Sequence, residues 1–171
     1  MQTKKHLFFG LTAAFSLLLM GCEKDDICDP TQSTTPRIVL EFHDVTNPNS
    51  LKNVANLKVI GIDESTEIGT YNGVSKIKLP LKITADQTTY KLISNSTDNT
   101  FTNTDILQFS YTRQTLYVSR ACGYKMVYTM NANQAIAQTD NTPTDGYWMQ
   151  QIILNNSSIQ TENETHVIIY F

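Results

Sequence analysis

An alternation of apolar and polar residues with a period of two recurs along the chain after Pro36. In the segment 76–83, aliphatic residues alternate with lysines and Pro80. Successive side chains of a β-strand point to opposite faces, so this pattern predicts a strand with one face in the core and the other in water. Pro80 cannot donate a backbone hydrogen bond to a neighbouring strand, which places the segment at a sheet edge or at a bulge. The patterning therefore favours β-structure.

The same alternation predicts eight or nine short strands separated by turn sequences. The predicted strands are 38–43, 57–62, 76–83, 89–93, 106–111, 115–119, 123–130, 148–154 and 166–171. Short gaps at Ala85–Gln87 and Thr112–Gln114 predict hairpins, whereas Asn131–Gln138 has a brief helical pattern. We therefore expect an all-β fold, an antiparallel β-sandwich with immunoglobulin-like Greek-key connections, formed as a single domain by residues 37–171.

The first 36 residues have a different composition. Two lysines precede an apolar stretch, residues 7–20, which is too short for a permanent membrane span but has the length of a signal-peptide core. The stretch leads into Leu-x-Gly-Cys, ending at Cys22, and this resembles the lipobox of bacterial lipoproteins. The resemblance implies that residues 1–21 are a signal peptide and that Cys22 becomes the lipidated N-terminus. Residues 22–36 are polar and contain two prolines, which predicts an acidic tether.

Removal of the signal peptide leaves 150 residues with 11 basic and 16 acidic side chains, a formal charge of −5. This balance argues against nucleic acid as a partner, because phosphate binding needs clustered lysine and arginine. It also disfavours adhesion of the folded part to anionic head groups. The membrane is therefore expected as a partner through acyl chains on Cys22, whose buried methylene groups supply the anchoring free energy.

The four residues after Cys22 bear on the membrane face that the protein occupies. Glu23, Lys24, Asp25 and Asp26 are similar to the lipoprotein export signal of Bacteroidota, in which a lysine precedes two acidic residues. The resemblance implies an outer-membrane lipoprotein that faces the cell exterior. An acidic linker without export function is the alternative, and it leaves the periplasmic face open.

Three cysteines remain after removal of the signal peptide. If Cys22 carries the lipid, Cys28 and Cys122 are left, and the cell envelope is an oxidising compartment. We therefore expect a Cys28–Cys122 disulfide that ties the N-terminal segment to the middle of the domain, with two free thiols as the alternative. A cysteine-based metal site is disfavoured, because neither residue has a Cys or His at ligand spacing.

Catalytic and cofactor motifs are missing from the sequence, so we expect no enzyme activity, no metal and no cofactor. There is no Gly-x-Ser-x-Gly elbow, and His43 and His166 are far apart with no carboxylate pattern nearby. The segment 140–146 superficially resembles a calcium loop but lacks its alternating acidic ligands and distal Glu, which favours a turn. If acid/base residues converge only in the fold, the candidates are Glu41, Asp44 and Asp105.

Aromatic residues near predicted loops give a positive indication of a binding surface. Tyr147 and Trp148 follow the turn at Asp145-Gly146, and Arg113 lies in the predicted hairpin at 112–114. Aromatic side chains at loop tips can stack on sugar rings or anchor protein partners. A position in the core is the alternative for Trp148.

Three strings of the sequence are the most distinctive: Cys-Glu-Lys-Asp-Asp-Ile-Cys at 22–28, Thr-Pro-Arg at 35–37, and Ser-Arg-Ala-Cys-Gly-Tyr-Lys at 119–125. Together they resemble an uncharacterised family of flavobacterial outer-membrane lipoproteins of unknown function. The resemblance implies a localisation rather than a mechanism, and it supports the pairing of Cys28 with Cys122. We expect a non-catalytic binding or accessory module whose partner is an envelope protein or glycan. The alternative is an envelope hydrolase whose carboxylates come from separate strands and loops.

Overall fold

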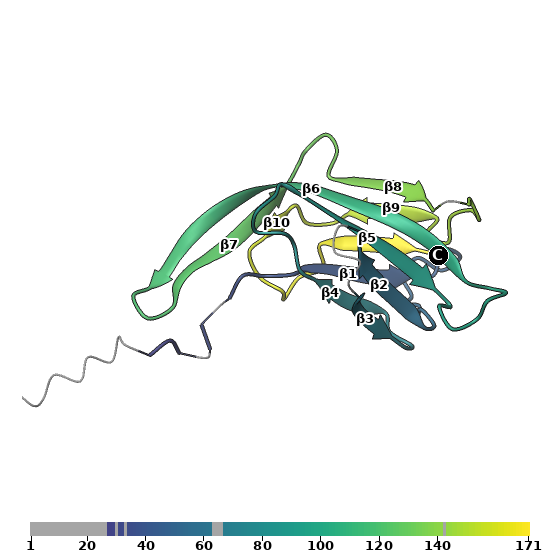
Figure 1. Cartoon of the computed structure of the whole chain (residues 1–171), viewed down its shortest axis with the longest axis horizontal. Coiled ribbons are helices and arrows are strands. Elements are labelled where there is room, and N and C mark those ends of the chain that lie inside the picture. Colours follow the sequence, from purple (N-terminus) through teal and green to yellow (C-terminus); the bar gives the residue numbers. More distant parts are fainter. Residues whose placement is uncertain (1–26, 30, 33, 63–66, 142) are drawn as a thin grey trace, which may run out of the picture. The chain divides into compact units, whose positions relative to one another are not determined.

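Eleven β-strands and no helix make up the part of the chain that the computed structural model describes, residues 27–29, 31–32, 34–62, 67–141 and 143–171 (Figure 1). The strands are β1 (Ile38–His43), β2 (Leu57–Gly61), β3 (Glu67–Tyr71), β4 (Lys76–Leu79), β5 (Gln87–Ser94), β6 (Asn103–Ser119), β7 (Gly123–Met130), β8 (Ile136–Asp140), β9 (Gln151–Leu154), β10 (Ser158–Ile159) and β11 (Val167–Tyr170). The predicted all-β class is therefore confirmed. The predicted signal peptide, Cys22 and the sequence from Glu23 to Asp26 lie outside the described residues.

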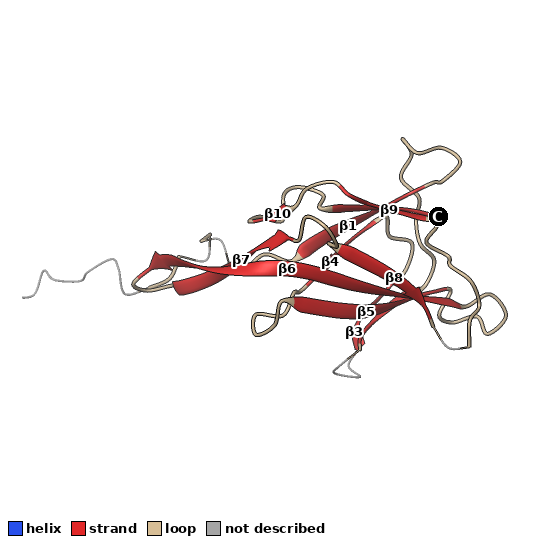
Figure 2. Ribbon diagram, turned by 90° about the horizontal axis from the view of Figure 1, so that it is seen from above, coloured by secondary structure: helices blue, strands red, loops and turns tan. Residues whose placement is uncertain are grey.

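The strands form two sheets that lie as two layers (Figure 2). One sheet has the order β4-β1-β11-β9, and the other has the order β10-β7-β6-β5-β2-β3 with β8 paired to β6. Strands β1 and β11 run parallel, so Leu40 lies opposite Val167, whereas their outer neighbours β4 and β9 pair with them antiparallel. This architecture is an open, mostly antiparallel sandwich, as expected from the alternation.

The core lies between the two sheets and is built from the apolar faces of their strands. Phe42 of β1 and Phe109 of β6 are fully buried, and Val167 and Ile169 of β11 are buried as well. Burial of such a side chain stabilises a fold by about 1.5–3 kcal/mol, so this shared layer supplies the main favourable contribution to folding. The alternation of β11 and of the second half of β1 is thus explained by one face in the core, whereas Val39 is buried on the opposite face of β1.

Strand β4 is an edge strand, as Pro80 indicated, and it ends at Leu79 rather than at residue 83. Its partner is β1, whereas β5 pairs with β2 and β6 in the other sheet. The hairpin predicted at Ala85–Gln87 is therefore wrong. The chain crosses from one sheet to the other after Pro80, where the missing N–H ends the ladder.

The hairpin predicted at Thr112–Gln114 is also wrong, because β6 continues through these residues to Ser119. The turn follows at residues 120–122, and Gly123 adopts a left-handed φ of 70°, a conformation that costs glycine little. The extended backbone at Arg113 is stabilised by its side chain, whose Nε donates to Asp86 Oδ1 at 2.7 Å and whose Nη1 donates to the Ile83 carbonyl. A polar triplet in sequence is compatible with a turn or a strand, and here these contacts favour the strand.

The brief helix predicted at Asn131–Gln138 is replaced by a loop and the start of β8. Strand β8 pairs antiparallel with β6, and Ile136 lies opposite Phe109. The short strands β3, β8 and β10 were not predicted, which is why the sequence suggested eight or nine strands. Pairing with β2, β6 and β7, respectively, supplies β3, β8 and β10 with the hydrogen bonds that their weak local patterns did not reveal.

Two compact units can be distinguished among the described residues. One contains the residues up to Gln32 together with Tyr117–Tyr124, and the other contains residues 34–116 and 125–171. We call the first the tip unit and the second the sandwich unit. Within the described ranges, no helix is long and apolar enough to cross a membrane.

Candidate functional site

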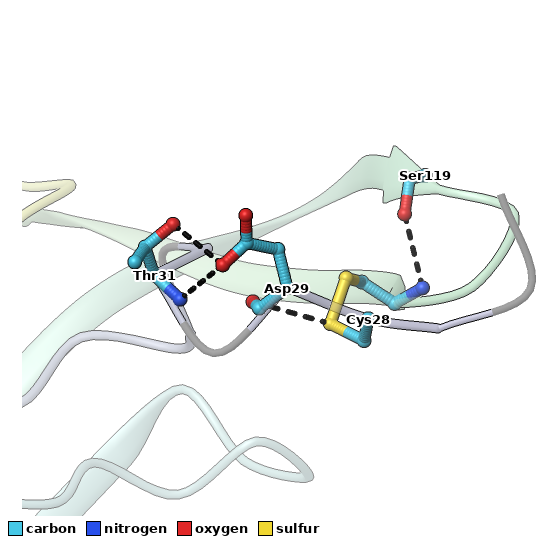
Figure 3. Close-up of a disulfide and its surroundings, with 5 residues drawn as sticks. Cys28, Asp29, Thr31 and Ser119 are labelled. Carbon is cyan, nitrogen blue, oxygen red and sulfur yellow. Dashed lines mark hydrogen bonds between the residues drawn. A yellow bond between two sulfur atoms is a disulfide. The ribbon is translucent and has the colours of Figure 1, made fainter. Parts of the chain in front are cut away.

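The tip unit contains the Cys28–Cys122 disulfide that the sequence led us to expect (Figure 3). The Cα atoms of the two cysteines are 4.7 Å apart, within the range that a disulfide requires, although 94 positions separate them in the sequence. A segment that follows the predicted lipidation site is thus covalently joined to the turn between β6 and β7.

Short-range hydrogen bonds fix the backbone on both sides of this disulfide (Figure 3). Asp29 Oδ1 accepts hydrogen bonds from the backbone N–H and the hydroxyl of Thr31, both at 2.8 Å. These two hydrogen bonds lower the pKa of Asp29, and the bond from the backbone N–H has the larger effect. On the other side, Ser119 Oγ accepts a hydrogen bond from the Cys122 N–H at 3.0 Å. Turns closed by side chains of this kind present a defined backbone without secondary structure of their own.

Two exposed tyrosines lie beside the disulfide turn. Tyr117 is 61% exposed and Tyr124 is 70% exposed, yet their rings pack edge to face with centroids 5.4 Å apart. A hollow of about 430 Å³ adjoins Tyr117 and is lined by residues of both segments of the unit, namely Ile27, Asp29, Gln32, Tyr117 and 119–122. We call these residues together with Tyr124 the hairpin-tip surface.

The hairpin-tip surface has the chemistry of a recognition surface. Tyrosines combine a rigid apolar ring with a polar tip and are enriched in protein interfaces. The exposed Ile27 side chain adds aliphatic area at the rim of the hollow, and Asp29 adds a carboxylate. Such a mixture can bind a partner by contact.

The residues predicted as binding loops do not form one surface. Arg113 is bound to Asp86 and to the Ile83 carbonyl, so its guanidinium stabilises the sandwich unit. Trp148 packs edge to face on Phe171, with centroids 5.5 Å apart, and its indole N–H donates to the Leu92 carbonyl at 3.0 Å. Trp148 is partly buried and packs against the core, so its ring is held by the sandwich unit. Tyr147 is exposed, as a ligand-contacting residue must be.

The two histidines occupy different environments. His43 contacts Glu41 Oε1 through Nε2 at 2.8 Å and the Pro48 carbonyl through Nδ1 at 2.7 Å. His166 is buried, and its Nδ1 accepts a hydrogen bond from the Val39 N–H at 2.9 Å. Burial lowers the pKa of His166, which favours the neutral ring that this acceptor role requires. Both histidines therefore have structural partners.

The carboxylates considered for acid/base chemistry also differ from one another. Burial opposes ionisation of Glu41, but hydrogen bonds from Lys76, His43 and Thr165 outweigh it and lower its pKa to about 2. Asp105 is fully buried, and burial followed by the charge of Asp140 raises its pKa to about 6. Within the described part of the chain, no three His, Cys, Asp or Glu side chains lie close enough together to hold a metal ion.

A second, apolar hollow of about 280 Å³ lies in the sandwich unit where the chain crosses between sheets after β4. Its lining includes Ile62, Ile68, Ile83 and Tyr90. Apolar side chains line many ligand sites, but such sites also need a few converging polar groups, and this lining offers mainly Lys82 and threonines. The hairpin-tip surface is therefore the better candidate for recognition.

Comparison with known proteins gives a family but no activity. No match was found among curated proteins or among solved structures. A family model described as a family of unknown function (DUF6452) matches residues 56–171, which include the turn of the hairpin-tip surface and most strands of both sheets. Because the match covers more than half of the chain, the protein belongs to this family of unknown function, DUF6452.

Proposed function

We propose that this protein is an outer-membrane lipoprotein of a member of the Bacteroidota, anchored through Cys22 and displayed on the cell exterior, that acts as a non-catalytic binding or accessory module. The lipobox and the signal peptide before it support the anchor. The sequence Lys24-Asp25-Asp26 supports display on the outer face. The observation that carries the binding role is the exposed tyrosine pair beside the Cys28–Cys122 disulfide.

The disulfide relates the hairpin-tip surface to the proposed anchor. Cys28 lies six positions after Cys22 in the sequence, and an extended chain over six positions spans at most about 20 Å. A lipid on Cys22 therefore keeps Cys28, and through the disulfide Cys122, within that distance of the membrane surface. A partner of the hairpin-tip surface is accordingly a component of the envelope itself.

An envelope protein is the partner class that the side chains favour. Exposed tyrosines with an adjacent aliphatic side chain supply the large apolar contacts that carry much of the binding energy in protein interfaces. An envelope glycan is the second candidate, because tyrosine rings also stack on sugars. The hydrolase alternative requires two carboxylates in one cleft, whereas Glu41 is engaged by Lys76 and Asp105 is buried.

The anchor predicts a simple change of localisation. Substitution of Cys22→Ala removes the sulfur that carries the lipid, so the variant should leave the membrane fraction or remain unprocessed at the size of the full chain. Fractionation followed by immunoblotting measures both. A variant with unchanged size and unchanged membrane partition would show that Cys22 is not the anchor.

The binding role predicts that capture depends on the tyrosine pair. The protein is isolated from detergent-solubilised outer membranes, and co-purifying proteins and glycans are identified by mass spectrometry. The variant Tyr117→Ala/Tyr124→Ala should capture at least about tenfold less partner than the wild type, because truncating a hot-spot aromatic residue costs roughly 2 kcal/mol or more of binding free energy. Both side chains are exposed, so the substitutions should leave the thermal unfolding temperature almost unchanged.

The matched control is Phe101→Ala/Tyr147→Ala, which removes two exposed aromatic residues of the sandwich unit. This variant should retain the partner. If it loses the partner while Tyr117→Ala/Tyr124→Ala retains it, recognition occurs at the sandwich loops and the hairpin-tip surface is not the binding site.

A further inference from the structure

Three side-chain oxygens in the described residues are buried and have no hydrogen-bond partner: Asn103 Oδ1, Asp105 Oδ1 and Asp140 Oδ1. They come from two strands that lie side by side. Asp105 of β6 is the direct cross-strand neighbour of Asp140 of β8, and Asn103 lies two residues before Asp105 on the same face of β6. The unpartnered oxygens therefore belong to one cluster.

The other polar atoms of these three side chains all bind the connection between β8 and β9. Asn103 Nδ2 donates to the carbonyls of Asp145 and Gly146 at 3.2 and 2.9 Å, and Asp140 Oδ2 accepts from the Gly146 N–H at 2.9 Å. Asp105 Oδ2 accepts from the Met149 N–H at 2.9 Å and from Gln138 Nε2 at 3.1 Å. These hydrogen bonds to Oδ2 hold the side chains of Asp105 and Asp140 in place, and Oδ1 of each is left to bind a further ligand.

The charge of the cluster identifies the class of that ligand. Asp105 is 0% exposed, and the ion pairs of the described residues do not include Asp105 or Asp140. A fully buried carboxylate beside a second carboxylate, without a cationic partner, is unfavourable, and each buried oxygen without a hydrogen bond adds a desolvation penalty. A bound cation removes both penalties, because it supplies positive charge and a ligand bond to each oxygen.

We propose that Asn103, Asp105 and Asp140 form a binding site for a hard divalent cation, of which Ca²⁺ fits best. The donor atoms are all oxygens, and Ca²⁺ accepts about six to eight oxygen ligands in flexible geometry, including amide oxygens, backbone carbonyls and water. Mg²⁺ demands a near-ideal octahedron and binds less well to donors fixed by two strands and a loop. The site would tie β6 and β8 to the connection that leads to β9. It does not depend on the lipid anchor or on the hairpin-tip surface.

Thermal unfolding and terbium luminescence test the site in the purified full-length protein. The two-carboxylate site should bind Ca²⁺ with a dissociation constant of about 10⁻⁴–10⁻³ M, the range of extracellular calcium modules. Addition of 10 mM CaCl₂ after EDTA treatment should then raise Tm by roughly 3–10 °C, and MgCl₂ by clearly less. Tb³⁺, a probe for Ca²⁺ sites, should show luminescence excited through Trp148, which directly precedes Met149, whose backbone N–H donates to Asp105.

Asp140→Asn is the main variant, because it keeps the acceptor for the Gly146 N–H but removes one charge. It should abolish the Ca²⁺-dependent rise in Tm while its Tm in EDTA stays at or above that of the wild type, since repulsion with Asp105 is gone. If Asp140→Asn does not fold, Asp105→Asn is the substitute variant. Either variant should lose the terbium luminescence. The control Asp86→Asn removes a carboxylate at the other end of the β5–β6 pair and should respond to Ca²⁺ like the wild type. An absent Ca²⁺ response in the wild type, or an equal response in all variants, overturns the proposal.

Discussion

Replacement of both Cys28 and Cys122 by serine should lower the free energy of unfolding by about 3–4 kcal/mol. The disulfide closes a loop of 94 residues, and in the chain-entropy model a loop of this length stabilises a fold by roughly 4–5 kcal/mol. The expected value is smaller, because the segment before Gln32 also gains freedom in the folded protein when the disulfide is removed. From Thr35 onward the chain has other anchors, such as the bond from the Met126 N–H to Thr35 Oγ1 at 3.0 Å.

Urea denaturation of the oxidised wild type and of Cys28→Ser/Cys122→Ser measures this difference. Wild-type protein denatured in the presence of a thiol reductant is the control, and it should unfold at the same midpoint as the double variant. Chymotrypsin should also cleave after Tyr117 or Tyr124 faster in the double variant, since the disulfide no longer fixes the turn between them. Equal midpoints for the oxidised wild type and the double variant would show that the disulfide does not contribute to stability.

The sequence predicted best those strands whose pattern is decided by one buried face. Strand β1 was predicted with its observed bounds, and the inward positions Val167 and Ile169 of β11 were also predicted. Pro80 marked an edge strand because its effect is local: it lacks the N–H that a central strand must donate. The parallel pairing of β1 with β11 joins residues about 127 positions apart and leaves no local trace in the sequence.

Features that depend on a partner strand were not predictable in the same way. The segment 136–140 has little alternation and becomes a strand because β6 offers a free edge to it. The disulfide could be inferred from the number of cysteines, but the exposed tyrosine pair at Tyr117 and Tyr124 required the register of β6 and β7. For the proposed cation site a signal did exist. Asp105 occupies an inward position of a strand whose next inward residues, Leu107 and Phe109, are apolar.

Acidification from pH 5 to pH 2 should destabilise the protein by several kcal/mol through Glu41 and Glu162. Hydrogen bonds from Arg37, opposed by burial and aided by Lys78, lower the pKa of Glu162 from 4.5 to about 2. The pKa of Glu41 falls from 4.5 to about 2 as well, because the hydrogen bonds of Lys76, His43 and Thr165 outweigh burial. Since both pKa values are lower in the folded state, their contribution is complete above the unfolded pKa near 4.5 and is lost as pH falls toward 2.

The lowering of each pKa from 4.5 to about 2 corresponds to a stabilisation of about 3 kcal/mol for each carboxylate. We expect roughly half of that, because both side chains remain in contact with water. Their side chains are 17% and 21% exposed. Urea denaturation between pH 7 and pH 2 should therefore show a steep loss of stability below pH 5 in the wild type. The variant Glu41→Gln/Glu162→Gln should start lower at pH 7 and follow a flatter curve, so the two curves should converge near pH 2.

Glu164→Gln is the matched control, because Glu164 is exposed and lies two residues from Glu162. It should leave the slope of stability against pH unchanged. Burial lowers the pKa of His166, so His166 also destabilises the folded state on acidification, but this effect begins at higher pH, just below the ordinary histidine pKa near 6.5. His166 is present in the wild type and in all these variants. A double Gln variant with the same slope below pH 5 as the wild type would therefore mean that other carboxylates cause the acid sensitivity. Convergence of the curves would instead assign it to the ion pairs by which Glu41 and Glu162 bind Lys76 and Lys78 of the edge strand β4.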